Sequence, residues 1–511
     1  MVKKIISNSL LLFVCYCFYS VQAVAAPEEE QGIIDMQAEI VATVGELDFR
    51  ECMVSAQGRD RKVQCATYSV SEKPGDASSN KIDLFVVRLP GKRRSDKIQD
   101  PMLFTAGGPG QSASESYLYV DQQFSDLARF RDFYLIDQRG TGQSNLMSCP
   151  NLIEELQFSV NVYDTEELQE AVKKCLEEMP GDVRYYTTDA SIDDFEKVRA
   201  ALGLKTWNVY GVSYGTRVAT HYMRKYPESL RTVVLDSPVP PQHILGSEIA
   251  WRSQDMLNVL YARCEAEQAC ADAMPDFRQK VEALFSELAD EQKAVRVESF
   301  ADGSIQDFNF TEDHLALVVR LYLYNPHMTA VLPPMLYEAA AKGNFSPLAR
   351  AAQNLETFMS KAMAVGLHNS VMCTEEVPFY NLSDADREAN ETSYMGMNLV
   401  QILQDVCSVW PALPAPEDMK APLESDLPTL LLSGEFDPIT PPAYAEQILE
   451  NLSAAKHLSL QGQGHFVGYI GCTPRLVNRF IEDASVEKID TACLNRAGSQ
   501  PLFINFNGPT P

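Results

Sequence analysis

Between residues 40 and 240, short apolar runs alternate with stretches whose apolar residues recur at helical spacing. The runs predict strands at Ile82–Leu89, Pro101–Ala106, Asp132–Asp137, Thr206–Gly211 and Arg231–Asp236. The last three are apolar almost throughout, which is typical of strands buried on both faces of a parallel sheet. The helical spacing is found in Thr165–Met179, Asp189–Gly203 and Gly215–Pro227. This alternation predicts an α/β fold with a mostly parallel sheet.

The pattern changes in the middle of the chain. Four amphipathic stretches predict helices at Met256–Met274, Phe277–Gln292, Thr311–Tyr324 and Leu348–Val365. Strand-like runs return at Thr429–Gly434 and Ala455–Gln461. We therefore expect a helical cap at 243–425, inserted over the active-site edge of a core made of 26–242 and 426–511.

A candidate nucleophile lies at the end of one predicted strand. Ser213 is framed by Gly211 and Gly215 and is followed at once by a predicted helix. A serine in G-x-S-x-G between a strand and a helix is the nucleophile elbow of the α/β-hydrolase fold. The backbone N–H of Tyr214 is then expected to point at a developing oxyanion near the helix N-terminus.

A serine nucleophile needs a general base and an acid that orients the base. On this fold, the acid and then the histidine follow the serine along the chain. Of the histidines, His457 falls inside a predicted strand and is interpreted as structural, whereas His465 lies in a glycine-flanked loop after the last strand. Asp437 follows the preceding strand and is the predicted acid, with Glu435 as the alternative.

A glycine-rich loop follows the predicted strand Pro101–Ala106, where a second oxyanion donor is expected. We assign this donor to the N–H of Gly108, with Gly107 as the nearest alternative. The loop "DQRGTGQS" after the next strand contains Arg139, which is expected to pair with acids in either a structural or a catalytic role.

The composition narrows the class of function. The 511-residue chain has a formal net charge of −27, which argues against nucleic acid as a partner. No Cys or His grouping has metal-ligand spacing, and a serine hydrolase needs no metal or organic cofactor.

The amino-terminal residues predict export. Lys3 and Lys4 precede the apolar run Leu10–Tyr19, and Ala23-Val24-Ala25 forms an A-x-A cleavage site. The run is too short to be a comfortable membrane anchor, so we expect a signal peptide at 1–25 and a periplasmic or secreted product. The ten cysteines after this segment are an even number, which favours disulfides, and pairing in sequence order is the simplest arrangement.

Five motifs, taken in order, resemble the proline iminopeptidase and tripeptidyl aminopeptidase family of serine peptidases: "GGPGQS", "DQRGTGQS", "GVSYGT", "GEFDPITP" and "GQGHF". One departure is that Ala106 stands where the family commonly has histidine before the glycines. The resemblance implies an α/β-hydrolase with a helical cap that cleaves peptides near their free N-terminus.

The resemblance also implies an acidic site in the cap for the substrate's α-ammonium group. The segment "SVMCTEEVPF" resembles the corresponding family segment and presents Glu375 and Glu376 for this role, with Cys373–Cys407 as a plausible bridge. Two solvated acids on a loop are the alternative interpretation.

The sequence thus predicts an exported serine aminopeptidase that forms an acyl-enzyme on Ser213. A carboxylesterase or small-molecule hydrolase with the same triad is the alternative, and a non-enzymatic binding protein is disfavoured because nucleophile, acid, base and oxyanion loop are all present. The number of residues released and the oligomeric state are not determined by the sequence.

Overall fold

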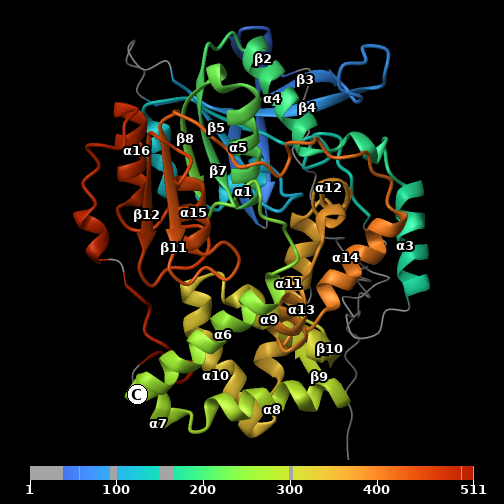
Figure 1. The fold of residues 1–511 in the computed structure, drawn as a ribbon, viewed down its shortest axis with the longest axis vertical. Coiled ribbons are helices and arrows are strands. Elements are labelled where there is room, and N and C mark those ends of the chain that lie inside the picture. The colour runs from blue at the N-terminus through green and yellow to red at the C-terminus, as the bar shows by residue number, and fades with distance from the viewer. Residues whose placement is uncertain are drawn as a thin grey trace, which may run out of the picture.

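The computed structural model describes residues 38–56, 58–92, 100–149, 165–298, 303–496 and 498–509. The predicted signal peptide lies outside the described residues. Figure 1 shows a core built on one large sheet and a mainly helical region beyond one end of its strands. No helix in the described ranges is long and apolar enough to cross a membrane.

The core sheet has ten strands in the order β1-β2-β3-β4-β6-β5-β7-β8-β11-β12. Pairings from β5 and β6 through to β12 are parallel, and those from β1 through β4 to β6 are antiparallel. The strands are β1 (Ile40–Val44), β2 (Leu47–Ala56), β3 (Arg59–Ser71), β4 (Lys81–Leu89), β5 (Met102–Thr105), β6 (Phe133–Ile136), β7 (Trp207–Val212), β8 (Leu230–Asp236), β11 (Thr429–Gly434) and β12 (Ala455–Leu460).

The seven predicted strands correspond to β4, β5, β6, β7, β8, β11 and β12, whereas β1, β2 and β3 were not predicted. The missed β2 and β3 alternate between buried and exposed positions and carry charged residues on the exposed side. Such strands lack the continuous apolar run that marks β5, β6 and β7, where every residue is buried.

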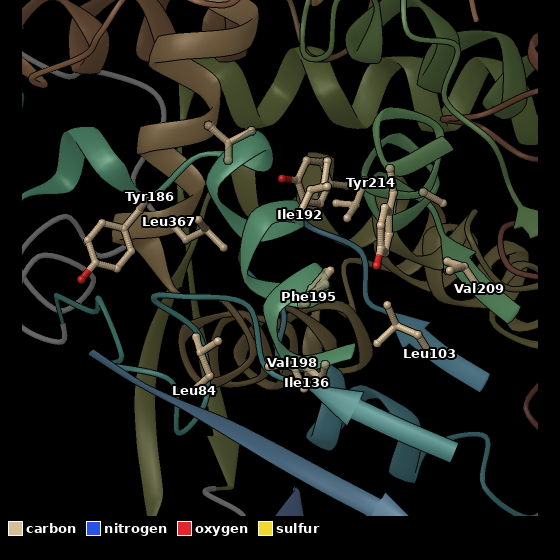
Figure 2. Close-up of a cluster of buried hydrophobic side chains, with 14 of the residues drawn as sticks. Leu84, Leu103, Ile136, Tyr186, Ile192, Phe195, Val198, Val209, Tyr214 and Leu367 are labelled. Carbon is tan, nitrogen blue, oxygen red and sulfur yellow. The ribbon is translucent and has the colours of Figure 1, made fainter. Parts of the chain in front are cut away.

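Helices cover both faces of the parallel part of the sheet. On one face, α4 (Thr188–Ala201), α5 (Tyr214–Lys225) and α15 (Pro442–Leu449) share one apolar cluster with the strands. Figure 2 shows Ile192, Phe195 and Val198 of α4 directed at the strands beneath. On the other face, α1 (Ala113–Leu118) and α16 (Thr473–Asp483) pack into a second cluster. Both faces are therefore buried, as the apolar strands predict.

The cap between β8 and β11 has two parts. The first contains α6 to α11 and packs around its own apolar cluster. In the second part, Leu367, Val371 and Trp410 join the apolar cluster of the core. The helices are α6 (Ile249–Ala266), α7 (Gln268–Ala273), α8 (Phe277–Asp290), α9 (Glu312–Tyr322), α10 (Pro326–Lys342), α11 (Ser346–Ala362), α12 (Val365–Val371), α13 (Asp384–Glu391) and α14 (Asn398–Val409).

The cap contains elements that were not predicted from the sequence. It contains an antiparallel pair, β9 (Lys293–Glu298) with β10 (Ile305–Phe310). The helix α10 was not predicted because Pro333 and Pro334 lie within it, and proline normally interrupts a helix. Burial of Leu332, Met335 and Leu336 around these prolines favours the helix in the folded protein.

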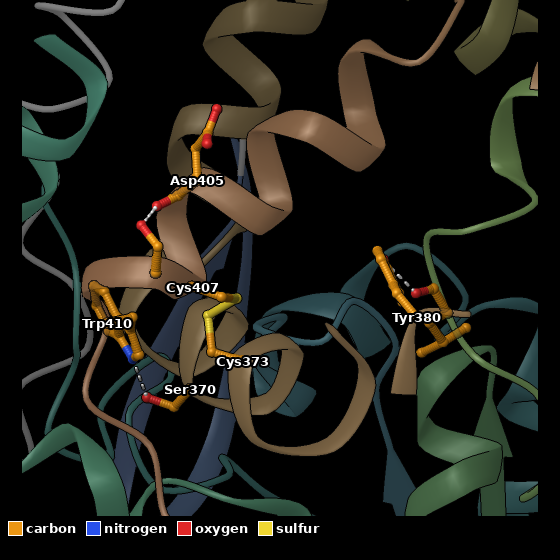
Figure 3. Close-up of a disulfide and its surroundings, with 8 residues drawn as sticks. Ser370, Cys373, Tyr380, Asp405, Cys407 and Trp410 are labelled. Atoms are coloured by element: carbon orange, nitrogen blue, oxygen red, sulfur yellow. Dashed lines mark hydrogen bonds between the residues drawn. A yellow bond between two sulfur atoms is a disulfide. The ribbon is translucent and has the colours of Figure 1, made fainter. Parts of the chain in front are cut away.

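All ten cysteines after the predicted signal peptide are paired in sequence order, so the simplest predicted arrangement is confirmed. The bridges are Cys52–Cys65, Cys149–Cys175, Cys264–Cys270, Cys373–Cys407 and Cys472–Cys493. Figure 3 shows the bridge from Cys373 to Cys407, beside which the indole N–H of Trp410 donates to Ser370 Oγ at 3.1 Å. This bridge ties α14 to the segment that carries Glu375 and Glu376.

Candidate active site

The parallel strands bring the predicted catalytic residues to one edge of the sheet. In the sheet, β5, β7, β8, β11 and β12 are consecutive neighbours. The carboxyl ends of parallel strands meet at the same edge, where α/β proteins build their sites. The loops that carry Gly108, Ser213, Asp437 and His465 follow four of these strands.

Ser213 occupies a strained turn between β7 and α5. Its backbone φ is 55°, a region that a non-glycine residue enters at a cost of about 1–3 kcal/mol. A Cβ on Gly211 would lie 2.4 Å from the carbonyl oxygen of Gly215, and one on Gly215 would lie 2.3 Å from that of Thr105. Only glycine therefore fits on either side of the serine, as the elbow motif requires.

His465 and Asp437 form the hydrogen bond that a catalytic pair needs. His465 Nδ1 lies 2.8 Å from Asp437 Oδ2. The other oxygen, Asp437 Oδ1, accepts the N–H groups of Ile439 and Thr440 at 2.9 and 2.8 Å, and Thr440 Oγ1 donates to Oδ2 at 2.7 Å. The aspartate is thereby fixed, and His465 presents Nε2 away from it.

The pKa values of this pair move in the directions that an ion pair produces. Burial opposes the charge on both groups, but their mutual attraction prevails. Consequently the pKa of Asp437 lies below its ordinary value and the pKa of His465 lies above its ordinary value of 6.5. Asp437 is therefore placed to stabilise a His465 imidazolium.

Asp236, which ends β8, links the nucleophile to the histidine loop and was not predicted as a site residue. Its carbonyl oxygen accepts the N–H of Ser213 at 2.9 Å. Its buried carboxylate accepts the N–H groups of Val467 and Gly468, two and three residues after His465, at 3.0 and 2.7 Å. Tyr210 Oη also donates to it at 2.7 Å, and burial raises the pKa of Asp236 to about 6. An acid closing the apolar run "RTVVLD" is the sequence signal that could have identified it.

The alternatives considered for base and acid lie elsewhere. His457 Nε2 is 2.7 Å from Ser433 Oγ, between neighbouring strands β12 and β11, which fits its structural interpretation. Glu435 Oε2 accepts the N–H of Gly462 at 2.8 Å and so holds the loop before His465. The structure thus brings Asp437, and not Glu435, to the histidine.

The glycine-rich loop after β5 lies directly against the nucleophile. A Cβ on Gly107 would lie 3.2 Å from Ser213 Cβ. Gly108 and Gly110 have φ values of 111° and 112°, which glycine adopts without strain. The backbone of Gly107 and Gly108 can therefore approach a bound group closely, and the N–H groups of Gly108 and Tyr214 remain the predicted oxyanion donors.

A cavity of about 480 Å³ opens beside this arrangement. The cavity is lined in part by Gly107, Val212 and Phe466, which are the sequence neighbours of Gly108, Ser213 and His465. Its wall also includes Glu115 in the first turn of α1 and Lys361 in the last turn of α11. Among the described residues, no group of three or more His, Cys, Asp or Glu side chains could hold a metal ion.

The structure does not place Glu375 and Glu376 in this cavity. Both lie in a π-helical turn, Met372–Glu376, and both are fully buried, so the alternative of two solvated acids is wrong. Glu375 accepts the N–H and the hydroxyl of Thr188 at 2.7 and 2.6 Å, and Thr188 Oγ1 lies 2.6 Å from Tyr214 Oη. Burial raises the pKa of Glu375 to about 7.

Glu376 is already neutralised by the protein's own cations. It forms an ion pair with Arg217 of α5, accepts Lys420 Nζ at 2.6 Å and accepts the N–H of Leu245 at 2.7 Å. The oxygens of Glu376 are occupied by these donors and enclosed, so the binding of a substrate ammonium by Glu376 stays a prediction that these contacts do not support. The two glutamates join the cap to α4 and α5 instead.

Arg139 has a structural position. Its guanidinium donates to both carboxylate oxygens of Asp194 at 2.8 Å and to the backbone carbonyls of Glu72 and Tyr185. Both side chains of this ion pair are buried. This bidentate contact attaches the loop after β6 to α4. Of the two roles considered for Arg139, it therefore has the structural one.

Comparison with known families matches two parts of the chain. Residues 100–272 match the family described as alpha/beta hydrolase fold, and residues 392–493 match the family described as TAP-like protein. The first match covers the strands that carry Gly108 and Ser213, and the second covers the loops of Asp437 and His465.

Three similar proteins agree with these matches. The putative hydrolase YuaR of Escherichia coli is 22% identical over 467 residues, which cover 83% of this chain and 88% of that protein. Serine protease Hip1 of Mycobacterium tuberculosis is 24% identical over 435 residues, 78% of this chain and 81% of that protein. Tripeptidyl aminopeptidase of Streptomyces lividans is 27% identical over 208 residues, 38% of each chain. The predicted fold and the predicted resemblance are confirmed.

Proposed function

We propose that this α/β hydrolase with a TAP-like region is an exported serine peptidase that cleaves peptide bonds near the free N-terminus. The observation that carries the proposal is the 2.8 Å hydrogen bond between His465 and Asp437, at the sheet edge that also carries the Ser213 elbow. The names of two similar proteins, a tripeptidyl aminopeptidase and a serine protease, support a peptide substrate. Five disulfides support export, because such bonds persist in oxidising compartments.

The proposed chemistry is acyl transfer in two steps. Ser213 Oγ attacks the scissile carbonyl while His465 Nε2 takes the hydroxyl proton, and the N–H groups of Tyr214 and Gly108 stabilise the oxyanion. His465 then gives its proton to the leaving amine, which departs and leaves an ester on Ser213. Water attacks this ester while His465 Nε2 takes a proton from it; the bond to Ser213 Oγ then breaks, His465 returns the proton to Oγ, and the acid product leaves.

Recognition of a free N-terminus requires a negative charge in the substrate cavity. Among the described residues that line this cavity, the acidic side chain is Glu115. We assign the substrate's ammonium group to the part of the cavity beside Glu115. Glu375 remains a second candidate from the sequence, although its contacts with Thr188 place it outside the lining.

Glu375 and Glu376 do not line the cavity, and this observation favours one alternative function. A carboxylesterase or small-molecule hydrolase with the same triad needs no ammonium site. The two functions differ in their dependence on the substrate's N-terminus and can be separated by assay.

The deciding experiment compares chromogenic prolyl, alanyl and tripeptidyl amides, each with a free or an acetylated N-terminus, and a short-chain ester. The variants are Ser213→Ala, Glu115→Gln and Glu375→Gln, with the exposed Glu228→Gln as control. The proposal predicts that free N-termini are strongly preferred, that Glu115→Gln raises KM for free but not acetylated peptides, and that Glu228→Gln changes neither. Turnover of the ester alone, or equal turnover of free and acetylated peptides, would contradict it.

A further inference from the structure

One short segment of the cap lies directly on the glycine-rich loop. We call Met363–His368, which leads from α11 into α12, the cap strap. The N–H of Ala364 donates to the carbonyl oxygen of Gly110 at 2.9 Å, and His368 Nδ1 lies 3.1 Å from the carbonyl oxygen of Pro109. The N–H of Gly366 donates to the carbonyl oxygen of Met147 at 2.8 Å, in the loop after β6. The cap strap therefore holds two core loops through their backbones.

The contact is too close for side chains at two positions. A Cβ on Gly110 would lie 2.9 Å from the carbonyl oxygen of Ala364, and one on Gly366 would lie 2.5 Å from Met147 Cβ. A Cβ contact below 3.0 Å forces the neighbouring atom to move, and the neighbour of Gly110 is the backbone oxygen of Ala364. The cap strap thus docks on the core in a single close-fitting arrangement.

The glycine-rich loop depends on such outside support. Among the described residues, its own backbone closes through one long hydrogen bond, from the N–H of Gln111 to the carbonyl oxygen of Gly107 at 3.4 Å. Pro109 has no N–H to contribute. The carbonyl oxygens of Pro109 and Gly110 are instead held by the cap strap, one and two residues after Gly108.

The protonation state of His368 suits this contact. Burial lowers the pKa of His368 and outweighs the hydrogen bond to Pro109, which raises it; the charge of Arg320 also lowers it, so the ring is neutral at neutral pH. A carbonyl oxygen only accepts hydrogen bonds, so Nδ1 of this neutral ring carries the proton and donates to Pro109. His368 contacts the loop and is not among the residues that line the cavity beside Ser213.

We propose that His368 is a positioning residue for the oxyanion loop, through which the docked cap strap holds Gly107 and Gly108 in the geometry that transition-state stabilisation requires. The inference rests on the proposed role of Ser213 and goes beyond it. It gives the cap an effect on the rate of acyl transfer that is separate from substrate selection. Because a misplaced oxyanion donor weakens binding of the transition state more than of the substrate, the loss appears in kcat.

The test compares His368→Ala with His368→Asn in the full mature chain. The amide N–H of asparagine can replace the Nδ1–H donor, whereas alanine cannot. The exposed His327→Ala in the same cap is the matched control. Each variant is measured for kcat and KM on the best amide or ester substrate, for the rate of covalent labelling by a fluorophosphonate, and for Tm.

The expected result for His368→Ala is a fall of about 10–100-fold in kcat and in labelling rate, with KM changed less than twofold, since loss of a whole oxyanion donor costs about 10²–10³-fold. His368→Asn recovers most of the rate, and His327→Ala matches the wild type. The inference would be overturned if His368→Ala left kcat unchanged or changed KM alone. It would also be overturned if His368→Ala lowered Tm and His368→Asn restored neither kcat nor the labelling rate. If Ser213→Ala were labelled as fast as the wild type, the proposed role of Ser213 would be wrong, whatever the result for His368.

Discussion

The sheet edge and the cap segment 363–376 are built in different ways. At the sheet edge, Ser213, Asp437 and His465 each follow a strand within a few residues, so the order of the strands places them together. In the cap segment, the polar groups act across long sequence distances. Glu375 contacts a residue 187 positions away, and His368 contacts one 259 positions away.

This difference separates chemistry from specificity. The sheet edge carries the groups to which we assign bond cleavage, and short motifs describe it well. The cap segment 363–376 attaches the cap to the core. Its two glutamates form a hydrogen bond with α4 and an ion pair with α5. In this structure the conspicuous pair of glutamates attaches the cap to the core, and Glu376 in particular is enclosed by the protein's own cations.

Removing the acid from the sheet edge gives the largest expected effect. Asp437→Asn keeps the shape but loses the charge that orients and stabilises His465, so kcat should fall by about 10⁴-fold. Glu435→Gln, which alters the neighbouring loop contact, should stay within tenfold of the wild type. Steady-state kinetics on purified proteins checks both, and comparable losses in the two variants would contradict the assignment of the acid.

Breaking the buried ion pair of the cap should affect stability. Glu376→Gln removes the ion-pair partner of the buried Arg217 and the partly buried Lys420, which typically costs about 3–5 kcal/mol. The exposed pair of Glu51 and Lys62 provides the control, since Glu51→Gln should cost no more than about 1 kcal/mol. Urea unfolding measures the two losses, and an equal small loss in both would remove the attachment role from Glu376.

Glu375 should impose a pH dependence on stability. Its pKa rises from 4.5 in the unfolded chain to about 7 in the folded protein, so its contribution is fully present below pH 4.5 and is lost as pH rises through 7. This amounts to roughly 3 kcal/mol. Glu375→Gln should remove that slope. Urea unfolding between pH 4.5 and 8 tests this, and identical slopes in wild type and variant would show that Glu375 does not titrate with folding.

The acid limb of activity should report on His465. The histidine must be neutral to act as base, and its pKa lies above 6.5 because of Asp437. Activity should therefore fall about tenfold per pH unit below that pKa, and the residual activity of Asp437→Asn should show a limb at lower pH. A kcat/KM profile that stays flat down to pH 4 would exclude His465 as the base.

Sequence reasoning placed correctly those residues that follow directly after a strand end. The elbow glycines, the loop of Gly107 and Gly108, and the choice of Asp437 over Glu435 all depend on local order along the chain. The parallel strands were visible because they are buried on both faces, and the cysteines were paired with their neighbours in sequence.

It failed where the outcome depends on distant partners. Nothing near Glu376 in the sequence shows that Arg217 and Lys420 will surround it, and nothing near Asp236 shows that Val467 and Gly468 will bind it. The strands β2 and β3 were missed because one side of each is polar, and α10 because it contains Pro333 and Pro334.

The most direct test of the central claim is to identify the residue that a fluorophosphonate modifies. The purified protein is labelled, its mass is measured, and the adduct is located by peptide mapping. We predict one adduct per chain on Ser213, labelling at least 100-fold slower in His465→Ala, and none in Ser213→Ala. An adduct on a different serine, or the same labelling in Ser213→Ala, would show that the nucleophile elbow does not carry the chemistry.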